Sequence, residues 1–595
     1  MSAHYDILIL NTRIVDGTGA PAYSGSVGIR GDRIAALGNL VGDATTTIDG
    51  SKWVTCPGFV DIHSHADTSI LEHPQAENLI MQGITTFVGG NCGFSLAPVA
   101  NRAGFDRIAK IWGLGLEPTW NRFGEWLDRV DVEKLSLNYV PLVGHNTVRG
   151  AVMGEDFRRT ATPAEIDVMK GMVAEAMTSG AFGLSVGVDA AWAGHFADVN
   201  EIVELAKIAK QYGGLFTPHT RHHQNQWPAA HPDEFGYGLF HAPKGEIIVG
   251  RYHGLIEAVE IAKKAGGIRL HIAHLTPAYL IPQPHPAFLD EAAARATLVD
   301  IVDRASQSGL DVTYNVVAWP SSIGTQVPII ESFFGERLLL PEWYKALGKE
   351  EFIANLRTPT FRQRVKQVIV SGYFKFGMLH PLADPYWMDC YQILRCRNSA
   401  YAGKTIGELA RQRRPDDILG AVYEEAAEVV FDVLADDPGA TWALIMDKRE
   451  YGALEVFLKH PAGIPASDVQ ALPAEPQGQS GIYDYGIPPI AYGLFPRFFR
   501  VHMREQGLLG LEEAVRKVTG LPAQRVLGLK DRGTLQEGAY ADVVVFDPTT
   551  IRERADALDP TRPPEGIAYV FVNGTMVNQQ GRPTGKRPGM VLRKS

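Results

Sequence analysis

Two histidines at the end of an apolar, strand-like run are the strongest local sign of chemistry in this sequence. The run Phe59-Val60-Asp61-Ile62 leads into His63-x-His65 within PGFVDIHSHAD. In a β-strand, residues i and i+2 point to the same face, so both imidazoles can face one metal ion. Neutral imidazole is the commonest ligand of zinc-like ions. The spacing alone leaves two interpretations open, a metal site and an ordinary pair of histidines at a strand end.

Other residue types that bind metals or move protons stand at the ends of later strand-like runs. A parallel barrel gathers the carboxyl ends of its strands at one face, so residues delivered one or two per strand can form a single site there. The arrangement carries more weight than any one residue, since a lone buried cysteine is ordinarily a small apolar core residue. The candidates are Cys92 in VGGNCGFS, His219 in LFTPHTRHH, His271 and His274 in IRLHIAHLT, and Asp468 in GIPASDVQ.

Strand-like and helical segments alternate through most of the chain, which predicts a parallel α/β fold. Apolar runs such as AFGLSVGV and GLDVTYNVV are separated by helical patterns such as PAEIDVMKGMVAEAMTSG. The number of repeats favours a closed (β/α)8 barrel over an open sheet. The stretch from about 327 to 460 is helical and charged, so we expect an insertion or enlarged loops over the barrel mouth. Both chain ends alternate apolar and polar residues between turn signals, including Asn573-Gly574, which is typical of small β units.

The composition is that of a folded protein larger than one ordinary domain. The chain has 595 residues, of which 45% are hydrophobic and 21% are charged. A formal net charge of −10 without a basic block gives no source for phosphate neutralisation, so nucleic acid is not an expected partner. No apolar run reaches the roughly 18 residues of a membrane span. Four cysteines are too few for a disulfide framework and the N-terminal sequence lacks a signal-peptide pattern, so we expect a cytoplasmic protein.

Seven motifs follow one another over nearly the whole chain: PGFVDIHSHAD, QGITTFVGGNCG, GAFGLSVGV, HIAHL, LKHPAGIPASD, AYGLFPR and GLPAQRVLGLKDRGTLQEGAYADVVVFDP. In type and order this series resembles the amidohydrolase superfamily, and within it the D-aminoacylase-like branch of N-acyl-D-amino-acid deacylases. The resemblance implies a TIM-like (β/α)8 barrel with a small β-sandwich domain built from both termini, here 1–57 and 536–595 around a barrel of 58–535. It also implies hydrolysis of a C–N bond other than a peptide bond by metal-activated water, with one or two zinc ions per chain.

The resemblance also implies a role for each matching residue. A metal ion lowers the pKa of bound water from about 15.7 toward 7 and polarises the carbonyl, while a carboxylate moves the proton. These residue types therefore suit amide hydrolysis. The resemblance assigns His63 and His65 to one metal position, His219 and His274 to the other, Cys92 as the thiolate ligand where other amidohydrolases have a carboxylated lysine, and Asp468 as general base and additional ligand.

Positions that should hold a substrate carboxylate depart from the family pattern. The lysine expected after HL is Thr276, a tyrosine expected after DVT is Trp319, and the arginine expected before AYG is Ile490. An unpaired carboxylate in a desolvated pocket is costly. We therefore predict a neutral or bulkier small-molecule amide as substrate, packed against Trp192, Trp227 or Trp319. Arg221 in HTR is the counter-argument, since it lies close to His219 and can pair with an anion.

Other functions are compatible with parts of this pattern. A true N-acyl-D-amino-acid deacylase with its anchors elsewhere, and a cyclic-amide hydrolase or deaminase, would use the same metal chemistry. A non-catalytic barrel protein acting as an assembly partner is disfavoured because every implied ligand is present, and a homo-oligomer stays open. The G-x-S-x-G motif at Ser185 matches the nucleophile elbow of serine hydrolases, but no helical pattern follows it directly. His271 is predicted to be structural, and Asp447 is the weaker rival of Asp468 as the base.

Overall fold

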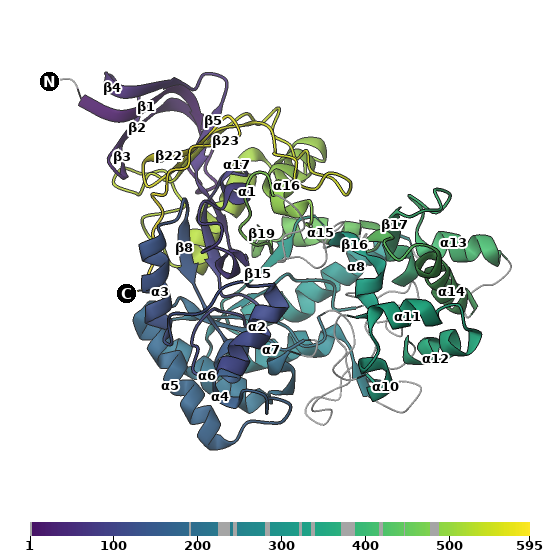
Figure 1. Ribbon diagram of the computed structural model, residues 1–595. Coiled ribbons are helices and arrows are strands. Elements are labelled where there is room, and N and C mark those ends of the chain that lie inside the picture. Colours follow the sequence, from purple (N-terminus) through teal and green to yellow (C-terminus); the bar gives the residue numbers. More distant parts are fainter. Residues whose placement is uncertain are drawn as a thin grey trace.

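The computed structural model has a β domain built from both termini, a central barrel and a subdomain inserted between barrel strands (Figure 1). Among the described residues, no helix combines the length and the apolar character needed to cross a bilayer. The structure describes residues 3–189, 192–223, 239–241, 247–279, 286–319, 324–334, 340–369, 387–415, 421–444, 447–476 and 487–594.

The two ends of the chain share one β-sheet. Strand β5 (Val54–Pro57) near the N-terminus pairs antiparallel with β20 (Val543–Phe546) near the C-terminus. Alternating apolar side chains such as Ile9 and Phe571 fill a separate core on this sheet. Asn573 (φ 47°) and Gly574 (φ 74°) form a tight turn, as the Asn-Gly pair predicts. The other strands of the nine-stranded sheet are β1 (Ala3–Ile14), β2 (Tyr23–Arg30), β3 (Arg33–Gly38), β4 (Gly42–Asp49), β21 (Ile567–Val572), β22 (Thr575–Gln579) and β23 (Arg582–Pro583).

The centre of the molecule is a barrel of parallel strands. A six-stranded sheet in the order β19-β15-β14-β11-β10-β9 lies next to a three-stranded sheet in the order β6-β7-β8. The backbone N of Asp468 donates to the carbonyl of His63 (2.9 Å), which joins the end of β19 to the end of β6 and closes the ring. The predicted fold class is therefore confirmed. The strands are β6 (Phe59–Asp61), β7 (Ile84–Gly89), β8 (Asn138–Pro141), β9 (Val143–Gly144), β10 (Gly183–Gly187), β11 (Leu215–His219), β14 (Arg269–Ile272), β15 (Val312–Val317) and β19 (Gly463–Ala466).

Helices between the strands pack on the outside of the barrel, and their ends follow sequence signals. Helix α5 (Pro163–Ser179) begins after Thr162, whose hydroxyl accepts a bond from the backbone N of Glu165 (3.3 Å), and ends at Gly180 with φ 115°. These are the capping preferences of Thr, Pro and Gly. The other helices of the barrel region are α1 (Glu77–Ile80), α2 (Arg102–Trp112), α3 (Phe123–Glu133), α4 (His145–Met153), α6 (Val199–Gln211), α7 (Arg251–Lys264), α8 (Phe288–Thr297), α9 (Arg304–Gln307), α15 (Asp447–Lys459), α16 (Ile490–Arg497) and α17 (Leu511–Val518); a hairpin of β12 (Leu239–His241) and β13 (Ile247–Val249) lies between β11 and α7 in the chain.

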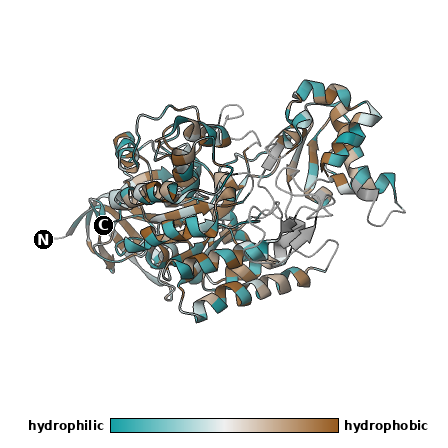
Figure 2. Ribbon diagram, turned by 90° about the horizontal axis from the view of Figure 1, so that it is seen from below, coloured by the Kyte–Doolittle hydropathy of each residue, from teal (hydrophilic) through white to brown (hydrophobic). Residues whose placement is uncertain are grey.

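The inserted segment folds around its own core. Phe333, Phe352, Phe431 and Trp442 belong to a hydrophobic cluster separate from that of the barrel. Figure 2 shows this subdomain as a lobe set apart from the barrel. It contains helices, as expected for this segment, and also a three-stranded antiparallel sheet that the sequence analysis did not identify. Its elements are β16 (Gly324–Pro328), α10 (Glu342–Lys345), α11 (Lys349–Asn355), α12 (Pro359–Ile369), β17 (Tyr391–Arg395), α13 (Ile406–Arg413), α14 (Ala421–Asp436) and β18 (Thr441–Leu444).

The insertion ends earlier than the predicted boundary near 460. Helix α15 packs against α8 and the barrel strand β19, and its Phe457 and Leu458 belong to the barrel core. An amphipathic pattern shows that a helix buries one face, but it does not show which of two neighbouring cores receives that face. The position of α15 therefore could not be assigned from periodicity.

Candidate metal centre

Four of the candidate residues, from three strand ends, converge on one buried point. His63 and His65 follow β6, Cys92 follows β7, and Asp468 follows β19. Oδ1 of Asp468 lies 3.2 Å from Nε2 of His63 and 3.2 Å from Nε2 of His65. Nε2 of His63 is also 3.4 Å from Sγ of Cys92. One donor atom from each of the four lies within 4.8 Å of the others, so together they can surround a single metal ion.

Cys92 also belongs to a second group, with His219 at the end of β11 and His274 just after β14. Sγ of Cys92 lies 3.5 Å from Nδ1 of His219 and 3.4 Å from Nε2 of His274. The other ring nitrogen of His219 is 3.5 Å from Oδ2 of the buried Asp189. Carboxylate–histidine contacts of this kind orient metal ligands. The two groups therefore meet at one thiol, and each can hold a metal ion.

Three of these residues have a left-handed backbone. The φ angles are 51° at Cys92, 32° at His274 and 59° at Asp468. A non-glycine residue in this region costs about 1–3 kcal/mol, and such residues cluster at functional sites because the surrounding structure must hold them there. Each of the three stands just beyond the end of a barrel strand. The backbone is thus turned sharply where the candidate donor atoms meet.

Burial determines the charges of these groups. Desolvation, with a smaller contribution from the Asp468 carboxylate, raises the pKa of the Cys92 thiol well above its usual range. Burial lowers the pKa of His63 and of His274, so both imidazoles are neutral and have a lone pair available. Desolvation also disfavours a charge on Asp468, but the imidazoles of His63 and His65 outweigh it and hold the pKa of that carboxyl well below its usual range.

This donor set fits a zinc-like cation. A buried thiol becomes a thiolate only beside positive charge, which a metal ion supplies. Imidazole nitrogen, thiolate sulfur and carboxylate oxygen are the ligands that zinc binds in proteins. Among the described residues, the groups that contain Cys92 are the clusters of three or more such donors close enough to hold a metal ion.

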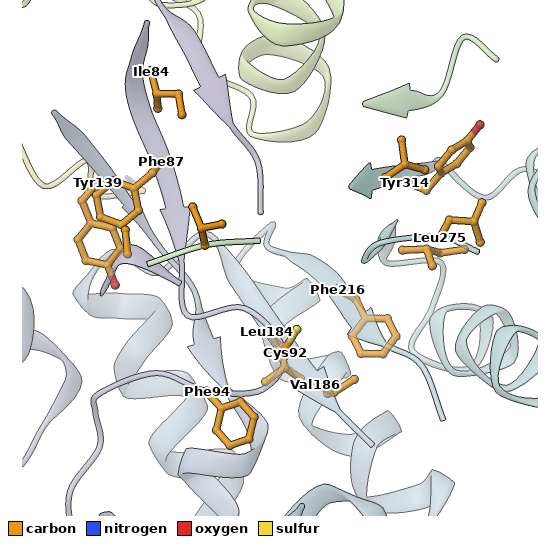
Figure 3. Close-up of a cluster of buried hydrophobic side chains, with 14 of the residues drawn as sticks. Ile84, Phe87, Cys92, Phe94, Tyr139, Leu184, Val186, Phe216, Leu275 and Tyr314 are labelled. Carbon is orange, nitrogen blue, oxygen red and sulfur yellow. The ribbon is translucent and has the colours of Figure 1, made fainter. Parts of the chain in front are cut away.

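Aromatic side chains border both groups. Trp112 stands at the end of α2, and its ring centroid lies 4.2 Å from that of His65. The ring centroid of Trp192 lies 4.8 Å from that of His219. Phe94 contacts Trp112 (5.7 Å) and Trp192 (5.0 Å), and it lies close to Cys92 in Figure 3. Trp192 thus lies beside the centre, as the proposed substrate contact requires. Trp112 was not among the predicted residues because it belongs to a helix between motifs.

Arg221 does not offer its charge to the centre, contrary to the sequence-based expectation. Its guanidinium donates to Glu257 from Nε (2.8 Å to Oε2) and from Nη2 (3.0 Å to Oε1). It also donates to the backbone carbonyls of His195 (2.8 Å) and Ala197 (3.0 Å). Both side chains of the ion pair are buried, with exposed fractions of 6% for Arg221 and 3% for Glu257. A planar guanidinium with these partners joins the loop after β11 to α7 and does not support a substrate-binding role.

Removal of Glu257 should expose the structural role of this pair. Glu257→Ala leaves a buried, uncompensated guanidinium, so we expect the free energy of unfolding to fall by about 3–5 kcal/mol. Urea unfolding followed by circular dichroism measures this change. Glu260→Ala, on the same helix, removes the exposed partner of Lys263 and should change stability by no more than about 0.5 kcal/mol. A Glu257 variant of wild-type stability would mean that Arg221 is available for a ligand.

The remaining predicted substrate residues lie in different surroundings. Thr276 is half-buried, two residues after His274. Trp319 is buried, and the guanidinium of Arg497 from α16 lies over its ring at 4.7 Å from the centroid. Trp227 lies outside the described residues. Of the two predicted tryptophans within the described residues, Trp192 is the one that lies against a candidate ligand.

Ser185 is held inside the barrel rather than presented at a nucleophile elbow. Its hydroxyl accepts a bond from the backbone N of Gly93 (3.0 Å) and donates to the carbonyl of Gly90. A short 3-10 helix, Ala193–Phe196, follows β10 where the elbow would require the start of an α-helix. The structure therefore gives no support to the serine-hydrolase alternative.

Several residues that support the centre were missed by sequence reasoning. Asp61 accepts bonds from the backbone N (3.0 Å) and the hydroxyl of Ser467, and burial raises the pKa of its carboxyl to about 7. Asp189 contacts His219, as described above, and the buried amides of Asn146 and Asn315 contact the backbone of candidate ligands. Asp61 stands two residues before His63, on the same strand face, which is a signal that could have found it.

His271, predicted to be structural, contacts Thr313 (2.8 Å) and Asn315 (3.0 Å).

Comparison with known proteins matches this architecture to one family. A model of the amidohydrolase family matches residues 489–578. The chain is 30% identical to an N-acyl-D-glutamate deacylase of Alcaligenes xylosoxydans xylosoxydans over 100% of its own length and 98% of that protein. The chain belongs to the D-aminoacylase branch of the amidohydrolase family. This amidohydrolase is also 29% identical to a D-aminoacylase of the same organism, over 100% of its length and 99% of the relative. The predicted family and enzyme class are confirmed.

Solved structures agree with this assignment. The amidohydrolase matches a D-aminoacylase with a TM-score of 0.68 and 26% identity, over 99% of this chain and 100% of that one. That D-aminoacylase has a binuclear metal centre, described in terms of one-metal activation and second-metal attenuation. It matches an N-acyl-D-glutamate deacylase of Bordetella bronchiseptica, in complex with zinc and a phosphonate that mimics the tetrahedral intermediate, with a TM-score of 0.67 and 27% identity over 99% and 100% of the two chains. A D-hydantoinase at 14% identity and a TM-score of 0.50 shares the fold.

Proposed function

We propose that this amidohydrolase binds zinc at the two groups that share Cys92 and hydrolyses the C–N bond of a neutral or bulky amide. His63, His65, Cys92 and Asp468 would hold one ion, and Cys92, His219 and His274 would hold a second. Zinc in such a site supplies a Lewis acid and lowers the pKa of water from about 15.7 toward 7. The convergence of both groups on one buried thiol is the observation that carries this proposal.

Asp468 is suited to move the proton in this reaction. Its carboxylate is held by the ring nitrogens of His63 and His65, and its side chain keeps an exposed fraction of 30%. Two ring nitrogens therefore orient the carboxylate, and part of its side chain stays accessible to solvent. In amide hydrolysis, the new C–O bond forms with loss of a water proton, and the leaving nitrogen must gain one. Asp468 would take the first proton and return it to the nitrogen as the C–N bond breaks.

The surroundings of the centre favour an uncharged, apolar substrate. The charge of Arg221 is balanced by Glu257. Thr276 stands where the family's lysine is expected, and Ile490 is buried where an arginine is expected. Trp112 and Trp192 place half-buried aromatic surface against His65 and His219. Aromatic surface binds apolar groups and gives a carboxylate no compensation for lost hydration.

A true N-acyl-D-amino-acid deacylase is the second candidate. Its support is the set of relatives, which act on N-acyl-D-amino acids as their names state. Arg251 offers a further argument. This buried guanidinium donates to the carbonyls of His223 (2.7 Å) and Pro277 (3.4 Å), and the ring centroid of His223 lies 4.9 Å from that of His219 and 4.3 Å from that of His274. An arginine at this place could also meet a substrate carboxylate. The two candidates differ in the charge of the preferred substrate.

Matched substrates separate the two candidates. With zinc-reconstituted protein, kcat/KM for N-acyl-D- and N-acyl-L-amino acids is compared with the same compounds carrying a carboxamide in place of the carboxylate. We expect the capped compounds to be preferred by roughly 10-fold or more, since an unpaired buried carboxylate costs more than about 1.4 kcal/mol. Preference for the free D-acids would establish the deacylase instead. A cyclic amide cleaved faster than either set would favour the cyclic-amide hydrolase.

Thr276→Lys provides a gain-of-function arm for the same measurement. An ammonium near His274 would pair with a substrate carboxylate, so turnover of the free acids should rise while that of the capped compounds does not. Thr276→Met, of comparable length and without charge, is the matched control. Equal effects of the two variants would contradict the account of the missing anchor. Ile490 is less suitable for such a test, because an arginine there would be buried in the barrel core.

A further inference from the structure

Two buried asparagines hold the backbone at the two left-handed members of the Cys92–His219–His274 group. The first is Asn146, near the start of α4, with an exposed fraction of 2%. Its Nδ2 donates to the carbonyls of Cys92 (3.2 Å) and of Gly187 at the end of β10 (3.1 Å). Its Oδ1 accepts from the backbone N of Gly194 (2.6 Å). Since carbonyls only accept and backbone N–H groups only donate, these partners fix the orientation of the amide.

The second asparagine, Asn315 on β15, acts on the other side of the same group. Its Oδ1 accepts from the backbone N of His274 (2.8 Å), and its backbone carbonyl accepts from the N of Leu275 (2.7 Å). Its Nδ2 donates to Nε2 of His271 (3.0 Å), whose Nδ1 meets the hydroxyl of Thr313 (2.8 Å). The same Nδ2 also lies 3.5 Å from Nδ1 of His63. Asn315 is fully buried. The turn at His274 is therefore held by side-chain and backbone atoms of one residue.

These bonds oppose the strain at Cys92 and His274. Both residues lie in the left-handed region, which an unsupported non-glycine residue leaves readily. Without the amides, the carbonyl of Cys92 and the N–H of His274 would lose these partners inside the barrel, where an unpaired polar group costs about 1–3 kcal/mol. The packing at Asn146 is also close, since a Cβ added at Gly93 would lie 2.7 Å from its Nδ2. The surroundings thus leave the Cys92 turn little room to relax.

We propose that Asn146 and Asn315 are positioning residues that hold Cys92 and His274 in the geometry for metal binding before the ion arrives. This inference rests on the proposed zinc site. Asn146 acts as a donor to the carbonyl of Cys92, whereas Asn315 acts as an acceptor for the N–H of His274. The two residues therefore hold the backbone with different amide atoms, the nitrogen in Asn146 and the oxygen in Asn315. Substitutions that remove one of these atoms and keep the other test the inference.

Aspartate substitutions separate the two roles, because aspartate keeps the acceptor oxygen and loses the donor. The zinc dissociation constant of the purified full chain is measured by competition with a chromophoric chelator, and Co²⁺ uptake is followed by the thiolate-to-metal charge-transfer band. Loss of residues that orient metal ligands typically weakens affinity by about 10–100-fold. We expect that weakening for Asn146→Asp, whereas Asn315→Asp should not weaken zinc binding. It keeps the oxygen that accepts from the N–H of His274, and its carboxylate can accept from Nδ1 of His63 in place of the lost amide contact. Asn315→Leu, which removes the acceptor, should weaken zinc binding like Asn146→Asp.

The matched control is Asn138→Leu. Asn138 is also a fully buried asparagine with several hydrogen bonds, but its partners are Thr86 within β7 and, near the terminal β domain, Asp542, Asn573 and Met590. This variant should lower the melting temperature and leave the zinc constant and the Co²⁺ spectrum unchanged. If a variant fails to fold, Asn146→Ser and Asn315→Ser are the milder replacements, with the same expected weakening.

The outcomes distinguish this inference from the function on which it rests. Zinc binding by the wild-type chain, with weakening in Asn146→Asp and none in Asn315→Asp, supports the inference. If the wild-type chain binds zinc and every variant stays within about threefold of it, the asparagines are structural only and the inference fails, while the proposed function stands. A wild-type chain that takes up no zinc overturns both.

Discussion

Replacement of Cys92 by serine is expected to abolish stable zinc binding and to lower kcat by roughly 10³-fold or more, equivalent to about 4 kcal/mol of transition-state stabilisation. The thiol is the one donor that both candidate groups share, with Sγ 3.4–3.5 Å from ring nitrogens of three histidines. A serine hydroxyl has nearly the same shape but is not an anion at neutral pH. Metal analysis after dialysis and steady-state kinetics on the best amide substrate measure the two effects.

Cys390 provides the control for this substitution. It is also a buried free cysteine, but it belongs to the core of the inserted subdomain. Cys390→Ser should lower stability modestly and leave zinc content and kcat unchanged. Wild-type zinc content in the Cys92 variant would mean that the histidines and Asp468 suffice, and the thiol would then be a core residue, as a lone buried cysteine usually is.

The fold was predictable to a large extent because its regular parts depend on local patterns. Buried strands such as VTYNVV at β15 are rich in β-branched and aromatic residues, and helices such as α5 carry both of their end signals. The inserted subdomain was less predictable. Its antiparallel strands β16, β17 and β18 are short and pair across long stretches of chain, and no local pattern encodes such pairing.

The candidate centre was predictable where a donor follows a strand within a motif. His63, His65, Cys92, His219, His274 and Asp468 all come together as the barrel topology requires. Residues that act on the backbone were not predictable in this way, because a buried asparagine such as Asn315 has no distinctive sequence spacing. Arg221 shows the opposite failure. Its place beside His219 suggested an anion site. Its partner Glu257 belongs to a later element of the sequence, helix α7, so no local pattern indicates the pairing.

Asp468→Asn is expected to lower kcat by roughly 10³-fold in protein saturated with zinc, within the 10²–10⁴-fold range of general acid–base catalysis. Zinc affinity should fall by less than this, because the amide oxygen can replace the carboxylate oxygen as a ligand. Asparagine keeps the size of the side chain and one oxygen that can face His63 or His65. It cannot take up a proton near neutral pH. The turn at this position, with φ 59°, is well suited to asparagine, which tolerates the left-handed region better than most residues. Steady-state kinetics on the zinc-loaded variant, with metal analysis of the same sample, measure the effect.

Asp447→Asn tests the rival base under the same conditions. Asp447 begins α15, which packs on the outer layer of the barrel against α8, so this variant should keep wild-type kcat. Because Asp468 is also a proposed ligand, kcat is compared at saturating zinc. If excess zinc restores wild-type kcat to the Asp468 variant, the residue serves metal binding alone. Retained activity in that variant would contradict the proton transfer assigned to Asp468. The two Asp→Asn substitutions together therefore decide which of the two residues is the base.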